Sequence, residues 1–395
     1  MSADPSRDRE AGAHSRMRIA LISSSFAPAV GGVEEAVHQL ARGLQANGHA
    51  VEVWTVDRDG GSSVRQLDGI TVRYLPTPLP AKSVGAITRF IGAAPSAWRE
   101  WARAVRAFRP ALVHVHCFGP NGMYALAVRR RFGIPLFVTS HGETIADDGG
   151  VFGRSALLRR GLRKAMARAT AVTAPSSVVL DDLEAHYGLE RGTVIPNGVD
   201  LSIVGAAPEE GQPYFFAAGR LGHMKGFDLL VRAFAAADLP PSVRLIIGGD
   251  GRERERLESL IASLGLDARV ELRGWMPAQA IADTMAGALA VVVPSRMEAF
   301  GLVALEAWRS AAPLIMTDRG GARSFVHDGE DGILIDPEDT QVFAVALQRL
   351  AGDATLRTNL SDAARLRVLD FSWDGVVSRY EALYADHGAA GGPAS

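Results

Sequence analysis

Short apolar runs alternate with helical segments along nearly the whole chain of 395 residues. In the first half, runs typical of buried strands occur at 17–23, 51–56, 70–75, 112–116, 136–140 and 171–174. Helical segments separate most of these runs, and the pattern resumes at Tyr214. Buried strands that alternate with helices favour a parallel, doubly wound sheet, so the fold class is α/β. A chain of this length favours two such domains over one.

A turn-rich stretch, 196–213, separates the two halves. It contains Pro, Asn and Gly, which are the residues that turns select. We therefore expect an N-terminal Rossmann-like domain over 17–205 and a C-terminal one over 206–372. The polar ends, 1–16 and 387–395, are expected to be disordered tails.

The composition excludes several classes of protein. The single cysteine, Cys117, excludes an internal disulfide framework and suits a reducing compartment. No apolar run reaches the roughly 18–20 residues of a membrane-spanning helix. The first 16 residues lack the apolar core of a secretory signal. We therefore expect a cytoplasmic protein.

The net charge of −2 is unevenly divided, with basic residues in excess before position 200 and acidic ones after it. A basic first half fits an anionic acceptor or a membrane surface, and it also fits a solvated surface with no partner. The segment 154–168 concentrates this charge, because it reads as a basic amphipathic helix without an acidic residue. Such a helix either packs its apolar face inward and solvates the other, or contacts the inner face of a membrane or a phosphorylated acceptor.

One strand, turn and helix carries two carboxylates. The apolar run 289–293 reads as a buried strand, and the helical pattern begins at Leu302. Glu298 lies in the turn, and Glu306 lies about one turn into the helix, roughly 6 Å along its axis. The free N–H groups of 301–303 and the positive end of the helix dipole favour an anion. An anion site between two carboxylates suited to hydroxyl groups matches a nucleotide sugar.

Two glycine-containing turns and a histidine also follow strands. Gly31-Gly32 lets the backbone approach a phosphate or a sugar closely. Arg220 and Lys225 flank a second such turn, where two cations would neutralise a diphosphate. Lys225 is one of only three lysines among 42 basic residues, which favours a specific role for its compact charge. His141 ends a strand at the edge where such sheets bind ligands, and either a sugar contact or a structural role fits it.

Other polar groups give weaker signals. Asp57 and Asp59 form an Asp-x-Asp without supporting metal ligands, and aspartates are common in turns. His114 and His116 alternate on one face of a strand, and a metal would need a third ligand. We interpret both histidines as packing or hydrogen-bonded groups, so no metal site is expected.

Five motifs in their order and spacing resemble those of the retaining glycosyltransferases of family 4, which have the GT-B fold. They are Gly31-Gly32-Val33-Glu34, Pro196-Asn197-Gly198-Val199-Asp200, Gly219-Arg220-Leu221 with Lys225-Gly226, Glu298 with Glu306, and Thr317-Asp318-Arg319-Gly320-Gly321. The resemblance covers about 17–385. It implies two Rossmann-like domains facing a cleft, with the donor mainly on the second and the acceptor on the first. It also implies that a last helix, 373–386, packs back on the first domain.

The resemblance also implies roles for single residues. Arg220 and Lys225 would bind the diphosphate, Glu306 would hold the ribose, and Glu298 would face the transferred sugar. His141 would contact the sugar from the opposite domain. Gly31 and Gly32 would abut the diphosphate and the acceptor. Backbone N–H groups would meet phosphate or sugar at Phe300, Gly301, Leu302 and Val303.

One departure from the family pattern is Ala299, which stands where the family often has glycine and so leaves the loop less freedom in φ. Glu298, His141, Arg220 and Lys225 are the candidate catalytic residues.

The expected reaction moves a hexosyl unit from a UDP- or GDP-sugar to an acceptor hydroxyl with retention, and it uses no metal or other cofactor. The acceptor stays open among a glycan, a lipid-linked sugar, a sugar phosphate and a small metabolite; no nucleic acid is expected. Two alternatives remain, a nucleotide-sugar epimerase of the same fold and a non-catalytic nucleotide-sugar-binding protein. A phosphorylase is disfavoured, since so few lysines offer no convincing site for pyridoxal phosphate.

Overall fold

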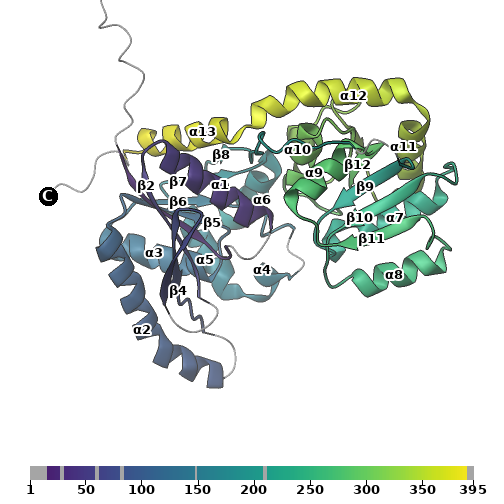
Figure 1. The fold of residues 1–395 in the computed structure, drawn as a ribbon. Helices are drawn as coiled ribbons and strands as arrows, with labels where there is room; N and C mark the ends of the chain where they lie inside the picture. Colours follow the sequence, from purple (N-terminus) through teal and green to yellow (C-terminus); the bar gives the residue numbers. More distant parts are fainter. Residues whose placement is uncertain are drawn as a thin grey trace, which may run out of the picture. The chain divides into compact units, whose positions relative to one another are not determined.

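The computed structural model describes residues 16–26, 31–57, 62–80, 84–146, 149–207 and 211–388 (Figure 1). The chain divides into two compact units. The first contains 1–139, 160–172 and 377–395, and the second contains 140–159 and 173–376. The domain bounds expected from the sequence, at 205 and 372, stay a prediction. The two expected tails lie almost entirely outside the described residues, as does most of the Asp57-x-Asp59 motif.

The larger sheet has eight strands in the order β3-β4-β2-β1-β5-β6-β7-β8. Their bounds are β1 (Arg18–Ser23), β2 (Ala50–Val56), β3 (Ser63–Leu67), β4 (Ile70–Leu75), β5 (Leu112–His116), β6 (Leu136–Thr139), β7 (Ala171–Ala174) and β8 (Thr193–Val194). β1 pairs in parallel with β2 and β5, as the sequence predicted. β3 was not predicted. It pairs antiparallel with β4, and it is mostly exposed, so its residues lack the apolar run that marks a buried strand.

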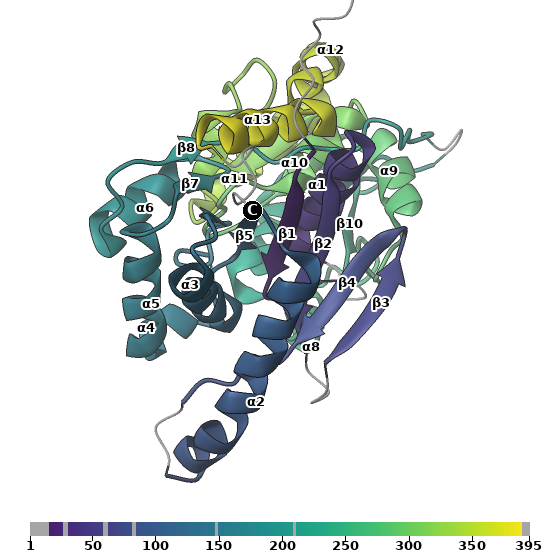
Figure 2. The same ribbon diagram turned by 90° about the vertical axis from the view of Figure 1, so that its left-hand side faces the viewer.

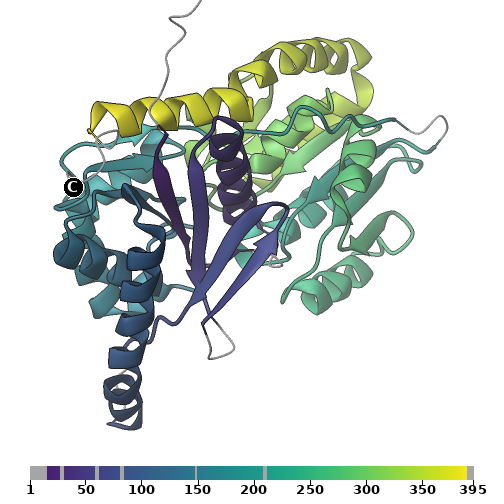
Figure 3. The same cartoon turned by 60° about the vertical axis from the view of Figure 1, so that its left-hand side comes forward.

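The described residues of this half of the chain also form helices, most of which follow a strand. They are α1 (Gly32–Ala46), α2 (Val84–Phe108), α3 (Pro120–Phe132), α4 (Val151–Arg154), α5 (Ala156–Met166) and α6 (Ser177–Tyr187). The first half of α2 extends away from the sheet (Figures 2 and 3). The predicted basic helix over 154–168 is divided at Ser155, where the backbone is extended between α4 and α5.

The smaller sheet has the order β11-β10-β9-β12-β13-β14, and all its neighbouring pairs are parallel. Its strands are β9 (Tyr214–Ala218), β10 (Arg244–Gly248), β11 (Val270–Gly274), β12 (Ala290–Val293), β13 (Leu314–Thr317) and β14 (Ile333–Ile335). Its helices are α7 (Phe227–Ala236), α8 (Arg254–Ser263), α9 (Ala278–Ala286), α10 (Leu302–Arg309), α11 (Thr340–Gly352) and α12 (Ala354–Arg367). Phe215 and Phe216 are fully buried in two different hydrophobic clusters, because successive strand residues face opposite sides of the sheet. Both faces are therefore covered by apolar contacts, as in a doubly wound sheet.

The last helix, α13 (Trp373–Asp386), packs on the first unit from Val377 onward. Val377 fills the space above Gly43 of α1, where a larger residue would collide with it. Glu381 accepts hydrogen bonds from Asn47 at 3.0 Å and from His49 Nε2 at 2.9 Å. The Met17 backbone N–H donates to His49 Nδ1, so the Nε2 nitrogen carries the ring proton. Figure 2 shows α13 lying across α1.

A second buried polar contact holds the same helix. His114 Nδ1 lies 2.6 Å from the Tyr384 hydroxyl, and His114 Nε2 lies 2.7 Å from Thr139 Oγ1. The interpretation of His114 as a hydrogen-bonded packing residue is therefore confirmed. Burial raises the pKa of Tyr384 well above its ordinary value, so this hydroxyl stays a neutral hydrogen-bonding group.

Candidate active site

Three loops meet at the carboxyl edge of the smaller sheet. They follow β9, β12 and β13, which are neighbours in the sheet although β9 and β12 are far apart in the sequence. The chain continues from β9 to β10 on one side of β9, whereas β12 lies on its other side, so the direction in which strands are added to the sheet changes between β9 and β12. Such a topological switch point is where open α/β sheets bind ligands. Eight of the eleven predicted site residues lie on the first two of these loops or on α10, which follows the second loop.

The central contact joins the first two loops. Lys225 Nζ donates to Glu298 Oε2 at 2.7 Å, and Ser295 Oγ donates to the same oxygen at 2.8 Å. The side chain of Glu298 is 10% exposed and that of Lys225 is 37% exposed. The carboxylate is therefore held in place by two donors, while the ammonium group keeps room for a second anion. The structure thus brings together two residues that the sequence singled out separately.

Arg220 lies on the same loop as Lys225, but it makes no contact with a carboxylate like that of Lys225 with Glu298. Its side chain is exposed, and among the described residues it forms no ion pair. The loop backbone is nevertheless fixed, because the Leu221 N–H donates to the Asp250 carbonyl and the Glu253 N–H to the Leu221 carbonyl. Arg220 is therefore an unpaired guanidinium on a rigid loop.

Arg296 is a site residue that the sequence reasoning missed. Its guanidinium forms two parallel hydrogen bonds with Asp228 of α7, at 2.8 and 2.7 Å, and a third with the His223 carbonyl. Burial alone would raise the pKa of Asp228, but the hydrogen bonds and the charge of Arg296 outweigh burial and lower this pKa below its ordinary value, so the pair stays ionised. Arg296 thereby ties the loop of Glu298 to the loop of Lys225. A single arginine beside a strand end carries no sequence signal for this role.

Helix α10 begins at the second loop. Gly301 precedes it with φ 92°, in the left-handed region that favours glycine. The first N–H groups of a helix have no partner within it, so those of Leu302 and Val303 remain available to an anion. The Phe300 ring is buried and stacks on Phe325, with ring centroids 4.4 Å apart. Only the backbone of Phe300 can therefore meet a ligand.

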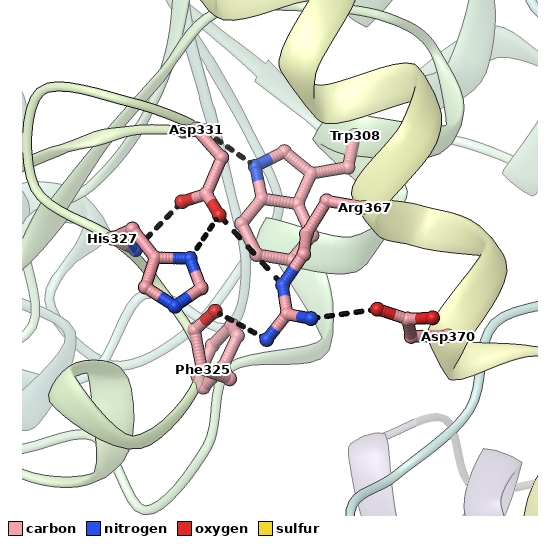
Figure 4. Close-up of polar contacts among 6 residues, drawn as sticks. All are labelled: Trp308, Phe325, His327, Asp331, Arg367 and Asp370. Atoms are coloured by element: carbon pink, nitrogen blue, oxygen red, sulfur yellow. Dashed lines mark hydrogen bonds and ion pairs between the residues drawn. The ribbon is translucent and has the colours of Figure 1, made fainter.

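The far end of α10 is anchored by a polar cluster (Figure 4). Trp308 Nε1 donates to the Asp331 carbonyl at 2.8 Å. The Asp331 carboxylate in turn accepts from the backbone and the ring of His327, at 2.7 and 2.8 Å. Arg367 of α12 lies beside this carboxylate and donates to Asp370 at 2.6 Å and to the Phe325 carbonyl at 3.3 Å. These contacts fix the axis of α10, and with it the position of Glu306, which is partly buried one turn into the helix.

The third loop packs directly against the second. Gly320, with φ 113°, forms a parallel bridge with Glu298, and a side chain at Gly320 would collide with the Glu298 carbonyl. The Gly321 N–H donates to that carbonyl at 2.8 Å. The backbone of Gly320 and Gly321 therefore supports the loop that carries Glu298.

Ala299 is buried against two further residues of the same unit. Its carbonyl accepts from Ser176 Oγ at 2.6 Å. Its methyl group occupies the space where a side chain at Gly142 would lie, so positions 142 and 299 cannot both carry one. The alanine that departs from the family pattern is accommodated by this glycine.

His141 precedes Gly142 and differs from an ordinary surface histidine. Its backbone N–H donates to Glu143 Oε2 at 2.8 Å. Desolvation by burial lowers the pKa of His141 from 6.5 to about 4, so its imidazole is neutral near pH 7. A neutral imidazole can donate or accept a hydrogen bond to a sugar hydroxyl.

The lowered pKa of His141 predicts how stability depends on pH. Between pH 6.5 and about 4 the unfolded chain takes up a proton that the folded protein excludes. The free energy of unfolding should therefore fall as the pH falls, and His141→Gln should reduce the loss by at most about 2 kcal/mol between pH 7.5 and 5. Urea unfolding at the two pH values measures this. Equal losses in wild type and variant would contradict it.

Gly31 and Gly32 belong to the first unit, where they precede and begin α1. Their expected contacts with the diphosphate and the acceptor stay a prediction. Among the residues that the structure describes, no group of three or more His, Cys, Asp or Glu side chains lies in position to hold a metal.

Solved structures share this fold of two α/β sheets. Sucrose-phosphate synthase from Thermosynechococcus elongatus is 24% identical with a TM-score of 0.82, covering 95% of this chain and 100% of that one. Anabaena Alr3699/HepE in complex with UDP is 20% identical with a TM-score of 0.73, covering 94% and 100%. The chain thus has the GT-B fold, and its fold class is confirmed.

The sequence comparisons are more specific. The model described as "Glycosyltransferase Family 4" matches residues 30–203, and that described as "Glycosyl transferases group 1" matches 203–367. D-inositol 3-phosphate glycosyltransferase 1 of Catenulispora acidiphila is 30% identical over 95% of this chain and 98% of its own length. The D-inositol 3-phosphate glycosyltransferase of Acidothermus cellulolyticus is 29% identical over 93% and 90%. The chain belongs to glycosyltransferase family 4, and it is a glycosyltransferase.

No described helix is both long enough and apolar enough to span a membrane.

Proposed function

We propose that this enzyme transfers a hexosyl unit from a nucleotide diphosphate sugar, with UDP or GDP as the nucleotide, to an acceptor hydroxyl with retention at the anomeric carbon. The observation that carries the proposal is the pair of Lys225 and Glu298 at the switch point, 2.7 Å apart, beside the N-terminus of α10. The same part of the sheet edge thus carries a cation, backbone N–H groups and two carboxylates, which are the groups that would bind the diphosphate and the hydroxyl groups of a nucleotide sugar.

The donor diphosphate would lie between cationic groups. Lys225 and the exposed Arg220 supply two positive charges, and the N–H groups of Leu302 and Val303 supply backbone donors. Lys225 and the backbone donors are held in place before the reaction, so they would stabilise the charge that develops on the leaving diphosphate. They do so without a metal. Glu306, one turn further along α10, would accept hydrogen bonds from the ribose hydroxyls.

The chemical step needs few protein groups. The bond between the anomeric carbon and the phosphate oxygen breaks, and the acceptor oxygen forms its bond on the same face. The acceptor proton passes to the departing phosphate oxygen. Glu298 is held by Lys225 and Ser295, so it orients the sugar by accepting hydrogen bonds. His141, neutral near pH 7, would contact the same sugar.

The class of acceptor is inferred from relatives rather than from the geometry of the site. Two relatives bear the name D-inositol 3-phosphate glycosyltransferase, and a phosphorylated polyol is therefore the first acceptor class to test. A glycan, a lipid-linked sugar and another small metabolite remain candidates. Gly31 and Gly32 would lie beside the acceptor, and residues 154–168 would contact the inner face of the membrane of a cytoplasmic enzyme.

The test begins with the donor. Thermal unfolding is measured with UDP, GDP, ADP and their sugars, since a ligand of the native state raises the unfolding temperature. The best donor is then incubated with phosphorylated and unphosphorylated polyols, and the anomeric configuration of the product is read by NMR. A β-linked product from an α-linked donor would refute retention.

Two variants test the site assignment. Lys225→Ala and Glu306→Ala should both weaken donor binding, and unchanged affinity in both would refute the assignment. An epimerase of the same fold would isomerise the donor without any acceptor, and a binding protein would do neither. Incubation with donor alone therefore identifies an epimerase, and incubation with donor and acceptor separates a transferase from a binding protein.

A further inference from the structure

A pocket of about 340 Å³ lies in the first unit, outside the loops described above. It is lined by Arg129 and Arg130 from the last turn of α3, Gly133 after it, Leu126, and Arg168. Three of its five lining residues are arginines and none is acidic. Its volume lies within the range of small-molecule sites.

The pocket lies at the opposite edge of its sheet from the edge where substrates bind. Gly133 precedes β6, and Arg168 precedes β7. Both therefore lie at the amino ends of parallel strands, whereas ligands of open α/β sheets bind at the carboxyl ends. The pocket is thus a separate feature from the donor and acceptor sites.

The arginines are placed by packing rather than by acidic partners. Arg129 donates to the Thr170 hydroxyl at 3.3 Å, which directs its guanidinium toward the turn after α5. Gly161 of α5 packs so closely on Met123 of α3 that a side chain there would collide with the sulfur atom. This contact sets α5 beside α3 and brings Arg168 to Arg129 and Arg130.

A basic stripe leads from α5 into the pocket. Arg160 and Lys164 are four residues apart in α5, so they share one face of the helix. Arg168 follows two residues after the end of α5, and all three side chains are exposed. Within the described ranges these three residues and Arg130 form no ion pair. Arginines in the last turn of α3 interact favourably with the negative end of the helix dipole. That interaction explains neither the position of Arg168 in the pocket nor the absence of acidic residues from its lining.

We propose that this pocket binds a phosphoryl group. Guanidinium groups match the geometry of phosphate oxygens and bind them through paired hydrogen bonds. Three of them in one pocket compensate the charge of a phosphate monoester or a diphosphate. The phosphate belongs either to a small phosphorylated ligand or to an anionic lipid headgroup, and in both cases Arg160 and Lys164 attract it along the stripe.

The test compares a triple variant with a matched control in the full chain. The pocket variant is Arg129→Gln, Arg130→Gln and Arg168→Gln. The control replaces three exposed arginines elsewhere in the first unit, Arg42→Gln, Arg99→Gln and Arg379→Gln, and changes the net charge equally. All proteins also carry Lys225→Ala, so that the proposed donor site does not bind the probe.

Two arms separate the sources of the phosphate. One measures calorimetric binding of inorganic pyrophosphate, and the other measures co-sedimentation with phosphatidylcholine vesicles with and without phosphatidic acid. The pocket variant should bind at least roughly 100-fold more weakly than the control in one or both arms. Loss of pyrophosphate binding identifies a soluble ligand, and loss of vesicle binding alone identifies a lipid headgroup.

Several outcomes would overturn the proposal. These are equal binding by the pocket and control variants, or no binding to either probe by the parent protein. Thermal unfolding shows whether the pocket variant folds. If it does not, Arg168→Gln alone takes its place, with an expected loss of roughly tenfold, because Arg168 lies beyond the end of α5.

Discussion

Replacing Lys225 by alanine should reduce kcat/KM for sugar transfer by about 100- to 1,000-fold, which is the usual effect of removing one preorganised charge at a developing anion. Lys225 is the cation closest to Glu298, at 2.7 Å, and more than a third of its side chain stays open to a ligand. Its loss removes the charge that would face the diphosphate. It also leaves the nearly buried Glu298 carboxylate with Ser295 as its remaining side-chain donor.

The matched control for Lys225→Ala is Arg273→Ala. Arg273 of β11 has the same side-chain exposure, 37%, and pairs with Glu271 at 2.9 Å, so its removal breaks the ion pair of an equally exposed cation outside the three loops. Steady-state kinetics should show the control within about twofold of wild type, as for a surface pair. A decrease of less than tenfold in the Lys225 variant would remove this residue from the catalytic machinery.

Gly320→Ala should destabilise the protein by about 3 kcal/mol or more and abolish transfer. A non-glycine residue at φ 113° is strained by about 1–3 kcal/mol. Its methyl group would also collide with the Glu298 carbonyl, and overpacking at a well-packed position costs about 1–3 kcal/mol more. Since Gly320 forms the bridge to Glu298, the catalytic loop must move to relieve the collision.

Gly329→Ala separates strain from collision. Gly329 has φ 79°, and a methyl group there would meet nothing within 4 Å. Its substitution should cost only the backbone strain, about 1–2 kcal/mol, and leave kcat unchanged. Chemical denaturation and kinetics of both variants make the comparison. Equal destabilisation of the two variants would show that the Gly320 contact does not support the loop.

The sequence predicted those features that depend on local pattern. Apolar runs marked the buried strands, and the switch from a strand pattern to a helical one at Leu302 gave the start of α10 within one residue. β3 was not predicted, because an exposed edge strand needs no apolar residues. The division of the basic helix at Ser155 was not predicted either, since the spacing of the basic residues continues across Ser155.

The site was predictable residue by residue but not as a set of contacts. Lys225 and Glu298 are 73 positions apart, and they meet only because β9 lies beside β12. The role of Arg296 depends on Asp228 from another loop and helix. The fit of Ala299 depends on Gly142, which is even further away in the sequence. Contacts of this kind are fixed by strand order, which periodicity does not reveal.

The packing of α13 imposes an order on biosynthesis. Glu381 and Tyr384 supply the partners of His49 and His114 inside the first unit, yet the ribosome adds them only after every residue of the second unit. Domains usually fold as they emerge, from the N-terminus onward. Here the first unit leaves the ribosome without the hydrogen-bond partners of His49 and His114, and it gains them only after the whole second unit has been translated. The first unit can therefore complete its fold only after the second unit has been synthesised.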